Sequence, residues 1–170
     1  IASLIQTSVG RIQINEITIP TQNGQWVTAD LYKPKTATAE TPAPMVVVVP
    51  GFQRSKETLS NLSIELSRRG IVVINIDPYA QGGSSASYST RAATTEGYGM
   101  FAVVDYAYET DNLNYIDKTR IGATGHSAGG LAAIRGATHF GKEANGKADI
   151  SKLHSVFVSG FIYRGFSQKD

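Results

Sequence analysis

Four short strand-like runs alternate with stretches of helical spacing through the middle and end of the chain. The runs cover residues 45–49, 71–76, 120–124 and 153–158. The first two are almost continuously apolar and rich in β-branched residues, which is typical of strands buried on both faces of a parallel sheet. Strands joined through helices form βαβ units, and the right-handed crossovers of these units place helices on both faces. The sequence therefore predicts an α/β fold.

The helical spacing between those runs is clearest over residues 55–70, 95–112 and 128–140. Ser55 is a candidate N-cap for the first of these helices, and Gly70 is a typical stop signal. The last helical stretch follows directly on the third strand-like run and consists largely of small residues. This order of strands and helices is that of successive βαβ units.

The first part of the chain has a different pattern. Residues 12–19 and 26–32 are rich in β-branched or aromatic side chains, and Asn23 and Gly24 between them are a strong hairpin signal. A polar linker with several prolines, residues 34–44, separates this hairpin from the βα units. We therefore expect a sheet that is antiparallel at its first strands and parallel afterwards.

The sequence Gly-His-Ser-Ala-Gly, residues 125–129, lies where a predicted strand meets a predicted helix. In that context the pattern is typical of a nucleophile elbow, a strained turn that exposes a serine hydroxyl. Small residues beside the serine let the strand and the helix approach closely. The pattern predicts Ser127 as a nucleophile and the Ala128 N–H as an oxyanion donor. The alternative, that Ser127 only caps the following helix, explains the serine but not its small neighbours.

Residues 124–129 also fit the Thr-Gly-x-x-x-Gly start of a short-chain dehydrogenase cofactor loop. Such a loop follows the first strand of its sheet, and an acidic residue ends the next strand. Here several predicted strands come first, the final glycine spacing differs, and the chain holds no Tyr-x-x-x-Lys. A nicotinamide-dependent reductase is therefore the minor alternative, and we expect no cofactor.

From residue 16 to residue 161 the chain resembles the α/β-hydrolase family, especially its dienelactone-hydrolase-like and prolyl-oligopeptidase-like branches. In sequence order, the matching motifs correspond to the opening hairpin, the oxyanion-hole strand, the loop after the fourth strand and the nucleophile elbow of that family. They lie at residues 19–24 with 29–34, 48–52, 77–84 and 120–130. Only the elbow is specific alone, but the ordered set is a strong resemblance.

This resemblance implies that the loop after residue 49 supplies a second oxyanion donor. Family members usually have His-Gly there, whereas this chain has Pro50-Gly51. The donor is a main-chain N–H, so the missing histidine side chain need not remove it. Phe52 is the expected donor and Gln53 the alternative. Gly51, taken alone, fits a simple tight turn equally well.

Three further residues are expected at the substrate site. Gln53, Tyr79 and His126 are predicted to contact substrate, although a packing role is an equal alternative for Tyr79. His126 is expected to pack or hydrogen-bond locally and to take no part in a triad. Asp77 precedes the nucleophile in sequence, so we expect a structural loop residue rather than the triad acid.

In this fold the triad runs nucleophile, acid, histidine along the chain. The histidines after Ser127 are His139, near the end of the helix that begins at the elbow, and His154, at the start of the next strand. Neither is expected to reach Ser127 as a general base. The acids after the elbow are Glu143, Asp149 and Asp170. The first two are expected in a polar loop at the wrong end of the sheet.

The resemblance thus implies a single incomplete α/β-hydrolase domain over residues 1–170, truncated after about the sixth strand. It consists of an extension over residues 1–11, a hairpin over 12–33 and βα units over 45–158. We expect an esterase-like serine hydrolase that acts on a small-molecule ester, with this fragment inactive because it lacks a triad histidine. Another polypeptide could supply the missing half. The alternative is a non-catalytic binding or scaffold module on the same frame.

Truncation after the last predicted strand has a physical consequence. Residues 153–158 would form an apolar edge strand with unpaired main-chain groups, which would normally be covered. We therefore expect the edge strand to pair with a second copy, as a homodimer, or to cause aggregation.

Composition limits which classes of protein and of binding site this chain can belong to. The chain is 41% hydrophobic and 18% charged, as in soluble globular proteins, and its net charge of +2 does not predict nucleic-acid binding. Its longest apolar run is far shorter than the roughly 18 residues of a membrane span. The lack of cysteine removes disulfides and cysteine-ligated metals, and we expect no metal. The chain begins at Ile1 rather than Met, so an upstream segment is expected; secreted, membrane-anchored and cytoplasmic locations all stay open.

Overall fold

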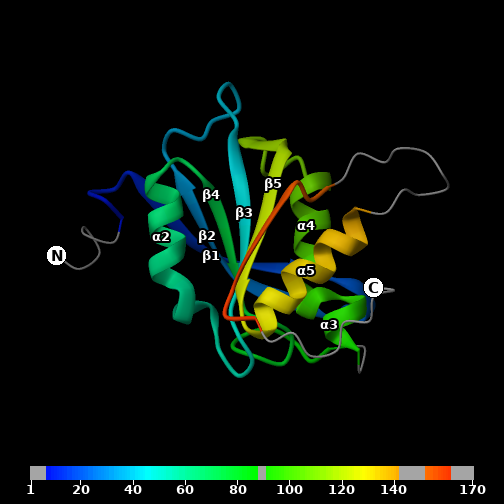
Figure 1. Cartoon of the computed structure of the whole chain (residues 1–170). Helices are drawn as coiled ribbons and strands as arrows, with labels where there is room; N and C mark the ends of the chain where they lie inside the picture. Colours follow the sequence, from blue (N-terminus) through cyan, green and yellow to red (C-terminus); the bar gives the residue numbers. More distant parts are fainter. Residues whose placement is uncertain (1–6, 88–90, 142–151, 162–170) are drawn as a thin grey trace.

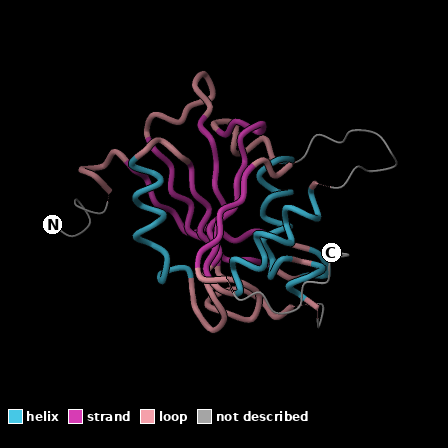
Figure 2. Tube along the Cα trace, viewed as in Figure 1, coloured by secondary structure: helices cyan, strands magenta, loops and turns pink. Residues whose placement is uncertain are grey.

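The computed structural model describes residues 7–87, 91–141 and 152–161. Its strands form one sheet in the order β1-β2-β4-β3-β5-β6, with helices on either side (Figures 1 and 2). The strands are β1 (Ile12–Pro20), β2 (Trp26–Pro34), β3 (Ala43–Val49), β4 (Val72–Ile76), β5 (Ile116–His126) and β6 (Ser155–Ser159). The helices are α2 (Ser60–Arg68), α3 (Ala92–Thr95), α4 (Met100–Glu109) and α5 (Ala128–Phe140), with 3₁₀ turns η1 (Gln22–Gly24), η2 (Lys56–Leu59) and η3 (Gly97–Gly99).

The predicted change from antiparallel to parallel pairing is confirmed. Strands β1 and β2 form an antiparallel hairpin, and β2 is also antiparallel to β4. From there β4, β3, β5 and β6 are all parallel to their neighbours. The hairpin turn lies at Asn23 and Gly24, whose φ angles of 58° and 73° suit the two residue types that adopt positive φ most readily.

Alternate residues of the central strand β3 face the two helical layers, because side chains of a strand alternate between its faces. Met45, Val47 and Val49 are fully buried in the core that contains residues of α4 and α5. Val46 and Val48 belong to a second cluster, which includes Leu66 of α2. The view of the sheet in Figure 1 shows α2 on one side and α4 and α5 on the other. The prediction of helices on both faces is therefore confirmed.

The first predicted helix begins later than its sequence suggested. Helix α2 begins at Ser60, and the 3₁₀ turn η2 precedes it. Ser55 makes no side-chain cap bond, because its hydroxyl donates to the carboxylate of Glu57 instead. The capping role expected of Ser55 is therefore wrong. Gly70, at φ +83°, follows the helix as a stop, as predicted.

The last described strand, β6, covers Ser155–Ser159, whereas the sequence predicts a strand over residues 153–158. It lies at one edge of the sheet, where it pairs only with β5 within the described residues. Phe157 in its middle is 69% exposed. None of the helices in the described ranges is both long enough and apolar enough to cross a membrane.

Candidate active site

Ser127 stands between the end of β5 and the start of α5, in a strand–turn–helix junction. Its backbone has φ 55° and ψ −115°, a combination that lies outside the allowed regions of ordinary L-residues and is therefore strained. The Ser127 N–H donates to the Ser159 carbonyl at 3.1 Å, and the Ser127 carbonyl accepts from Leu131 N–H at 3.1 Å. The Ser127 side chain makes no cap bond to the helix. The strained backbone therefore holds the serine, while its hydroxyl is not used for capping.

Two glycines let the strand and the helix meet at this turn. A Cβ atom on Gly125 would lie 2.3 Å from the carbonyl carbon of Gly129, and one on Gly129 would lie 2.0 Å from the Val49 carbonyl oxygen. Contacts this short require atoms to shift. Gly130, by contrast, would place a Cβ no closer than 3.3 Å to its neighbours. The close approach expected from the small residues therefore depends on Gly125 and Gly129 in particular.

The loop after β3 lies directly beside Ser127. Val49 is the register partner of Gly125, and a Cβ on Gly51 would lie 3.4 Å from Ser127 Cβ. Within the described residues, no hydrogen bond uses the N–H of Phe52 or of Ala128. The Gln53 N–H, in contrast, donates to the Gln81 side chain at 3.0 Å. Of the two N–H groups expected as the second oxyanion donor, that of Phe52 is therefore the one left open.

One hollow lies against the loops after β3 and β4, and another lies against the start of α5. One, of about 660 Å³, contains both Gln53 and Tyr79 among its lining residues; these are Phe52, Gln53, Arg54, Ser55, Tyr79, Ala80, Gln81, Gly82, Ser87, Ala92 and Tyr98. The other, of about 190 Å³, is lined by Ser127, Ala128, Leu131 and Phe161. Tyr79 is only 4% exposed, and its hydroxyl lies 2.7 Å from Thr21 Oγ1. Burial raises the pKa of Tyr79, so this side chain both packs in the core and contributes to a pocket wall.

His126 is exposed and packs between two loops. A Cβ on Gly160 would lie 2.6 Å from His126 Nε2, and one on Gly51 would lie 3.6 Å from His126 Nδ1. The imidazole therefore rests between the chain segments that follow β3 and β6. Its place beside Gly51 brings it to the same end of the sheet as Ser127.

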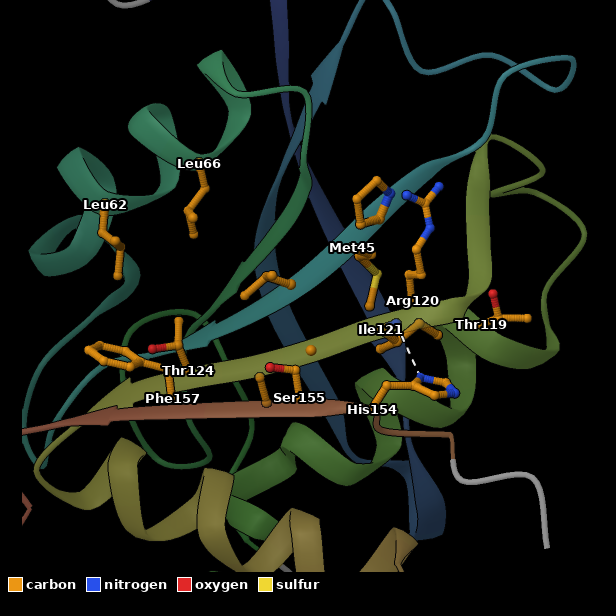
Figure 3. Close-up of a pocket in the computed structure, with 14 residues that line it drawn as sticks. Met45, Leu62, Leu66, Thr119, Arg120, Ile121, Thr124, His154, Ser155 and Phe157 are labelled. Carbon is orange, nitrogen blue, oxygen red and sulfur yellow. Dashed lines mark hydrogen bonds between the residues drawn. The ribbon is translucent and has the colours of Figure 1, made fainter.

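The other two described histidines lie away from Ser127. His154 stands just before β6, where its Nδ1 accepts the Ile121 N–H at 3.3 Å (Figure 3). Ile121 lies six residues before Ser127 along β5, which is roughly 20 Å of extended chain. His139, near the end of α5, stacks on Phe101 with ring centroids 4.4 Å apart. Glu143, Asp149 and Asp170, the acids named from the sequence, lie outside the described residues.

The pocket in Figure 3 is separate from the turn at Ser127. It has a volume of about 520 Å³ and opens between α2 and the sheet, with Leu62 and Leu66 on one side and Phe157 on the other. His154 also lines it. The residues around it are mostly apolar, and it marks a part of the sheet that no described helix covers.

Asp77 is a structural loop residue, as expected, and is 1% exposed. Its Oδ1 accepts the Lys56 N–H at 2.7 Å and its Oδ2 accepts the Gly83 N–H at 2.9 Å. A Cβ on Gly82 would lie 2.2 Å from the same carboxylate. Asp77 therefore ties the loop after β4 to the turn that precedes α2. The sequence gives no local signal for this link, since the partners are about twenty residues apart.

Lys56 was not singled out by its sequence pattern, yet four carboxylates surround it. Its Nζ lies 3.0 Å from Glu16, 3.2 Å from Glu57, 3.6 Å from Asp30 and 4.0 Å from Asp77. Burial lowers the pKa of Lys56, but hydrogen bonds to Glu16 and Glu57 and the charges of Asp30 and Asp77 outweigh it and raise the pKa above its usual value. The folded state therefore keeps this ammonium charged.

We expect Lys56→Met to lower the free energy of unfolding at pH 7 by about 3–5 kcal/mol, because it leaves buried carboxylates without a cation. Burial already raises the pKa of Asp30. Loss of Lys56 raises it further, so the folded state of the variant binds protons more tightly than the unfolded state. Its stability deficit should therefore shrink between pH 7 and pH 5. Urea unfolding at pH 7 and at pH 5 measures the two free energies of unfolding. Lys56→Arg keeps the charge and should lose much less stability. A Lys56→Met variant as stable as the wild type would contradict this account.

The dehydrogenase alternative places its cofactor loop after the first strand of the sheet. Residues 124–129 instead span the end of β5, which is the fifth strand of the sheet in chain order. The loop therefore does not stand where such a cofactor loop would stand.

Comparisons with known proteins agree with this geometry. A family model described as PETase, PET hydrolase-like, matches residues 1–152. Solved structures with the same fold include a hypothetical protein from Pseudomonas aeruginosa, at TM-score 0.69 and 23% identity, which covers 89% of this chain and 44% of its own. A hyperthermophilic esterase from the archaeon Pyrobaculum calidifontis has TM-score 0.62 and 25% identity, with 91% and 47% covered. Est1E from Butyrivibrio proteoclasticus, solved with ferulic acid bound, has TM-score 0.60 and 25% identity, with 72% and 47% covered.

The chain spans a little under half the length of each of these three solved proteins. The match to the family model, however, extends over most of the chain. The solved structures share the fold of this chain, in which a strained serine stands at a strand-to-helix turn beside the loop after β3. The chain belongs to the PET hydrolase-like family of α/β hydrolases.

Proposed function

We propose that this chain carries the nucleophile of a serine hydrolase that transfers the acyl group of a small-molecule ester to water. The observation that carries the proposal is Ser127, held at φ 55° between β5 and α5 beside two main-chain N–H groups without partners in the described residues. The PET hydrolase-like family and the esterases among the solved structures support an ester as the substrate. In this proposal the chain is one incomplete α/β-hydrolase domain.

The proposed reaction has two steps. Ser127 Oγ attacks the ester carbonyl carbon while a histidine takes its proton, and the oxyanion that forms is held by the N–H groups of Phe52 and Ala128. Collapse of this intermediate breaks the ester C–O bond, and the histidine returns the proton to the leaving alcohol. Water then attacks the acyl-enzyme by the same route and releases the acid and Ser127. Each oxyanion donor is typically worth about 3–4 kcal/mol of barrier.

The hollow of about 660 Å³ beside Phe52 is the proposed binding site for part of the substrate. Gln53 and Tyr79 form part of its wall. His126, which also lies beside Gly51, is the third proposed substrate contact. In this proposal the ester carbonyl binds at Ser127.

In the proposal, the histidine and acid of the triad come from outside the described residues, since His139 and His154 lie away from Ser127. The test compares ester hydrolysis by the 170-residue chain alone with hydrolysis by a longer protein, in which these residues are joined to the polypeptide that supplies the histidine in this proposal, using p-nitrophenyl butyrate. We expect turnover only from the longer protein. Hydrolysis by the 170-residue chain that disappears on Ser127→Ala would show that the base lies within these residues and would contradict this part of the proposal.

We also propose that the 170-residue chain, when isolated, self-associates through the edge strand β6. The edge carries the exposed Phe157, and charged residues on an edge strand oppose such pairing. Phe157→Lys should therefore shift the chain from dimers or larger species toward monomer in sedimentation velocity. Gln13→Lys places the same charge on the opposite edge strand, β1, and should change little. A stable monomer of the unmodified chain would rule out this association.

A further inference from the structure

We propose that Gln81 is a positioning residue that aims the Phe52 N–H at the oxyanion; this inference rests on the function proposed above. Gln81 lies in the loop after β4, whereas Phe52 lies in the turn after β3, so the two are brought together only by the fold. The Gln81 side chain does not need to touch the substrate for this role. It acts through the main chain of residues 51–54.

Three hydrogen bonds tie the Gln81 amide to this turn. Its Nε2 donates to the Gly51 carbonyl at 3.1 Å and also to the Arg54 carbonyl. Its Oε1 accepts the Gln53 N–H at 3.0 Å. One side chain therefore binds the first, third and fourth residues of the turn, and the second, Phe52, is the one whose N–H it leaves open.

The bond to Gly51 fixes the direction of the Phe52 N–H. The Gly51 carbonyl and the Phe52 N–H belong to one peptide group, and the described chain holds no cis peptide. In a trans peptide the carbonyl and the N–H point in opposite directions. Because the Gly51 oxygen points toward Gln81, the Phe52 N–H points away from Gln81. Gly51 lies beside Ser127, because a Cβ on Gly51 would lie 3.4 Å from Ser127 Cβ.

The turn needs such a partner because its backbone is strained. Gln53 has φ 56°, a conformation that costs a residue other than glycine roughly 1 kcal/mol or more. Within the turn itself, the only hydrogen bond among the described residues is from Arg54 N–H to the Gly51 carbonyl, at 3.2 Å. The contact from Gln53 N–H to Gln81 therefore stabilises the one residue whose conformation is unfavourable.

Gln81 is itself held in place by its own loop. Its N–H donates to the Pro78 carbonyl at 3.0 Å, and its carbonyl accepts from Ser84 N–H at 3.2 Å. Asp77 binds Gly83 on the other side of this loop. The amide of Gln81 is therefore presented by a fixed backbone, and a fixed donor costs no reorganisation when the oxyanion forms.

A misdirected Phe52 N–H should affect the transition state more than the bound ester, because the oxyanion exists only in the transition state. We therefore expect Gln81→Leu, in the longer catalytic protein, to lower kcat by about 10- to 100-fold while KM changes by no more than about twofold. Gln81→Glu keeps an acceptor for Gln53 N–H but loses the donor to Gly51. It should be as slow as Gln81→Leu.

The assay uses p-nitrophenyl butyrate. The concentration of active sites is measured by complete labelling with a fluorophosphonate, and kcat is calculated from that concentration so that misfolded protein is not counted. Gln25→Leu is the matched control, because Gln25 bonds the Ala86 carbonyl of the same loop and does not touch the turn. It should keep wild-type kcat. If Gln81→Leu and Gln81→Glu keep wild-type kcat per labelled serine, or change KM alone, while Ser127→Ala is inactive, this inference is wrong and the proposed function stands. If Ser127→Ala stays active, the proposed function fails instead.

Discussion

Ser127→Ala, made in the longer catalytic protein, is expected to lower kcat for ester hydrolysis by about 10⁴- to 10⁶-fold. The Ser127 hydroxyl is the only protein group in the proposed mechanism that forms a bond to the acyl carbon, so its loss removes the acyl-enzyme route altogether. Activity above the uncatalysed rate would then come only from binding and from the oxyanion donors. The measurement is steady-state hydrolysis of p-nitrophenyl butyrate by purified wild-type and variant proteins.

The same variant should leave the fold intact. The Ser127 hydroxyl makes no cap bond to α5, and the main-chain bonds of this residue to Ser159 and Leu131 do not depend on its side chain. We therefore expect a melting temperature within a few degrees of wild type. Ser60→Ala, at the start of α2 on the opposite face of the sheet, serves as a serine control and should keep full activity. A Ser127→Ala protein with wild-type kcat would remove Ser127 from the mechanism.

Gly129→Ala is expected to be strongly destabilising. Its Cβ would lie 2.0 Å from the Val49 carbonyl oxygen, and both atoms belong to backbone that a rotamer change cannot relieve. The helix would have to move away from the strand, which opens the buried contact at the elbow. Overpacking typically costs about 1–3 kcal/mol, and this contact with main chain should reach or exceed the upper end of that range. Urea unfolding measures the loss.

The neighbouring glycine provides the control for this prediction. A Cβ on Gly130 would come no closer than 3.3 Å to the Gly125 carbonyl oxygen, and alanine favours a helix over glycine by about 0.8–1 kcal/mol. Gly130→Ala should therefore change the free energy of unfolding by no more than about 1 kcal/mol in either direction. Equal stabilities of the Gly129→Ala and Gly130→Ala variants would mean that strand and helix do not approach as closely at this turn as the structure has them.

Patterns local to the sequence predict where individual strands and helices lie. The apolar run at residues 45–49 identified a strand buried on both faces, and β3 occupies Ala43–Val49. The small residues after Ser127 identified a helix over residues 128–140, which are the bounds of α5. In both cases the signal comes from residues that are close together in the sequence, namely their apolar character or their small size. Such a signal can be recognised without knowing the fold.

Features that depend on distant partners could not be obtained in this way. Lys56 draws its partners from both strands of the hairpin as well as from the loop after β4. Gln81 reaches across 27 to 30 residues to the turn beside Ser127. No local pattern marks these residues, because their roles arise only when the loops after β3 and β4 meet.

The most direct test of the central claim is covalent labelling with a fluorophosphonate, followed by peptide mass spectrometry. The probe phosphonylates an activated serine and depends on the same base and oxyanion donors as ester hydrolysis. We predict that the longer catalytic protein carries the label on Ser127 and that the 170-residue chain alone does not react. A label on any other serine, or a longer protein that hydrolyses esters with Ser127 unmodified by the probe, would contradict the assignment of Ser127 as the nucleophile.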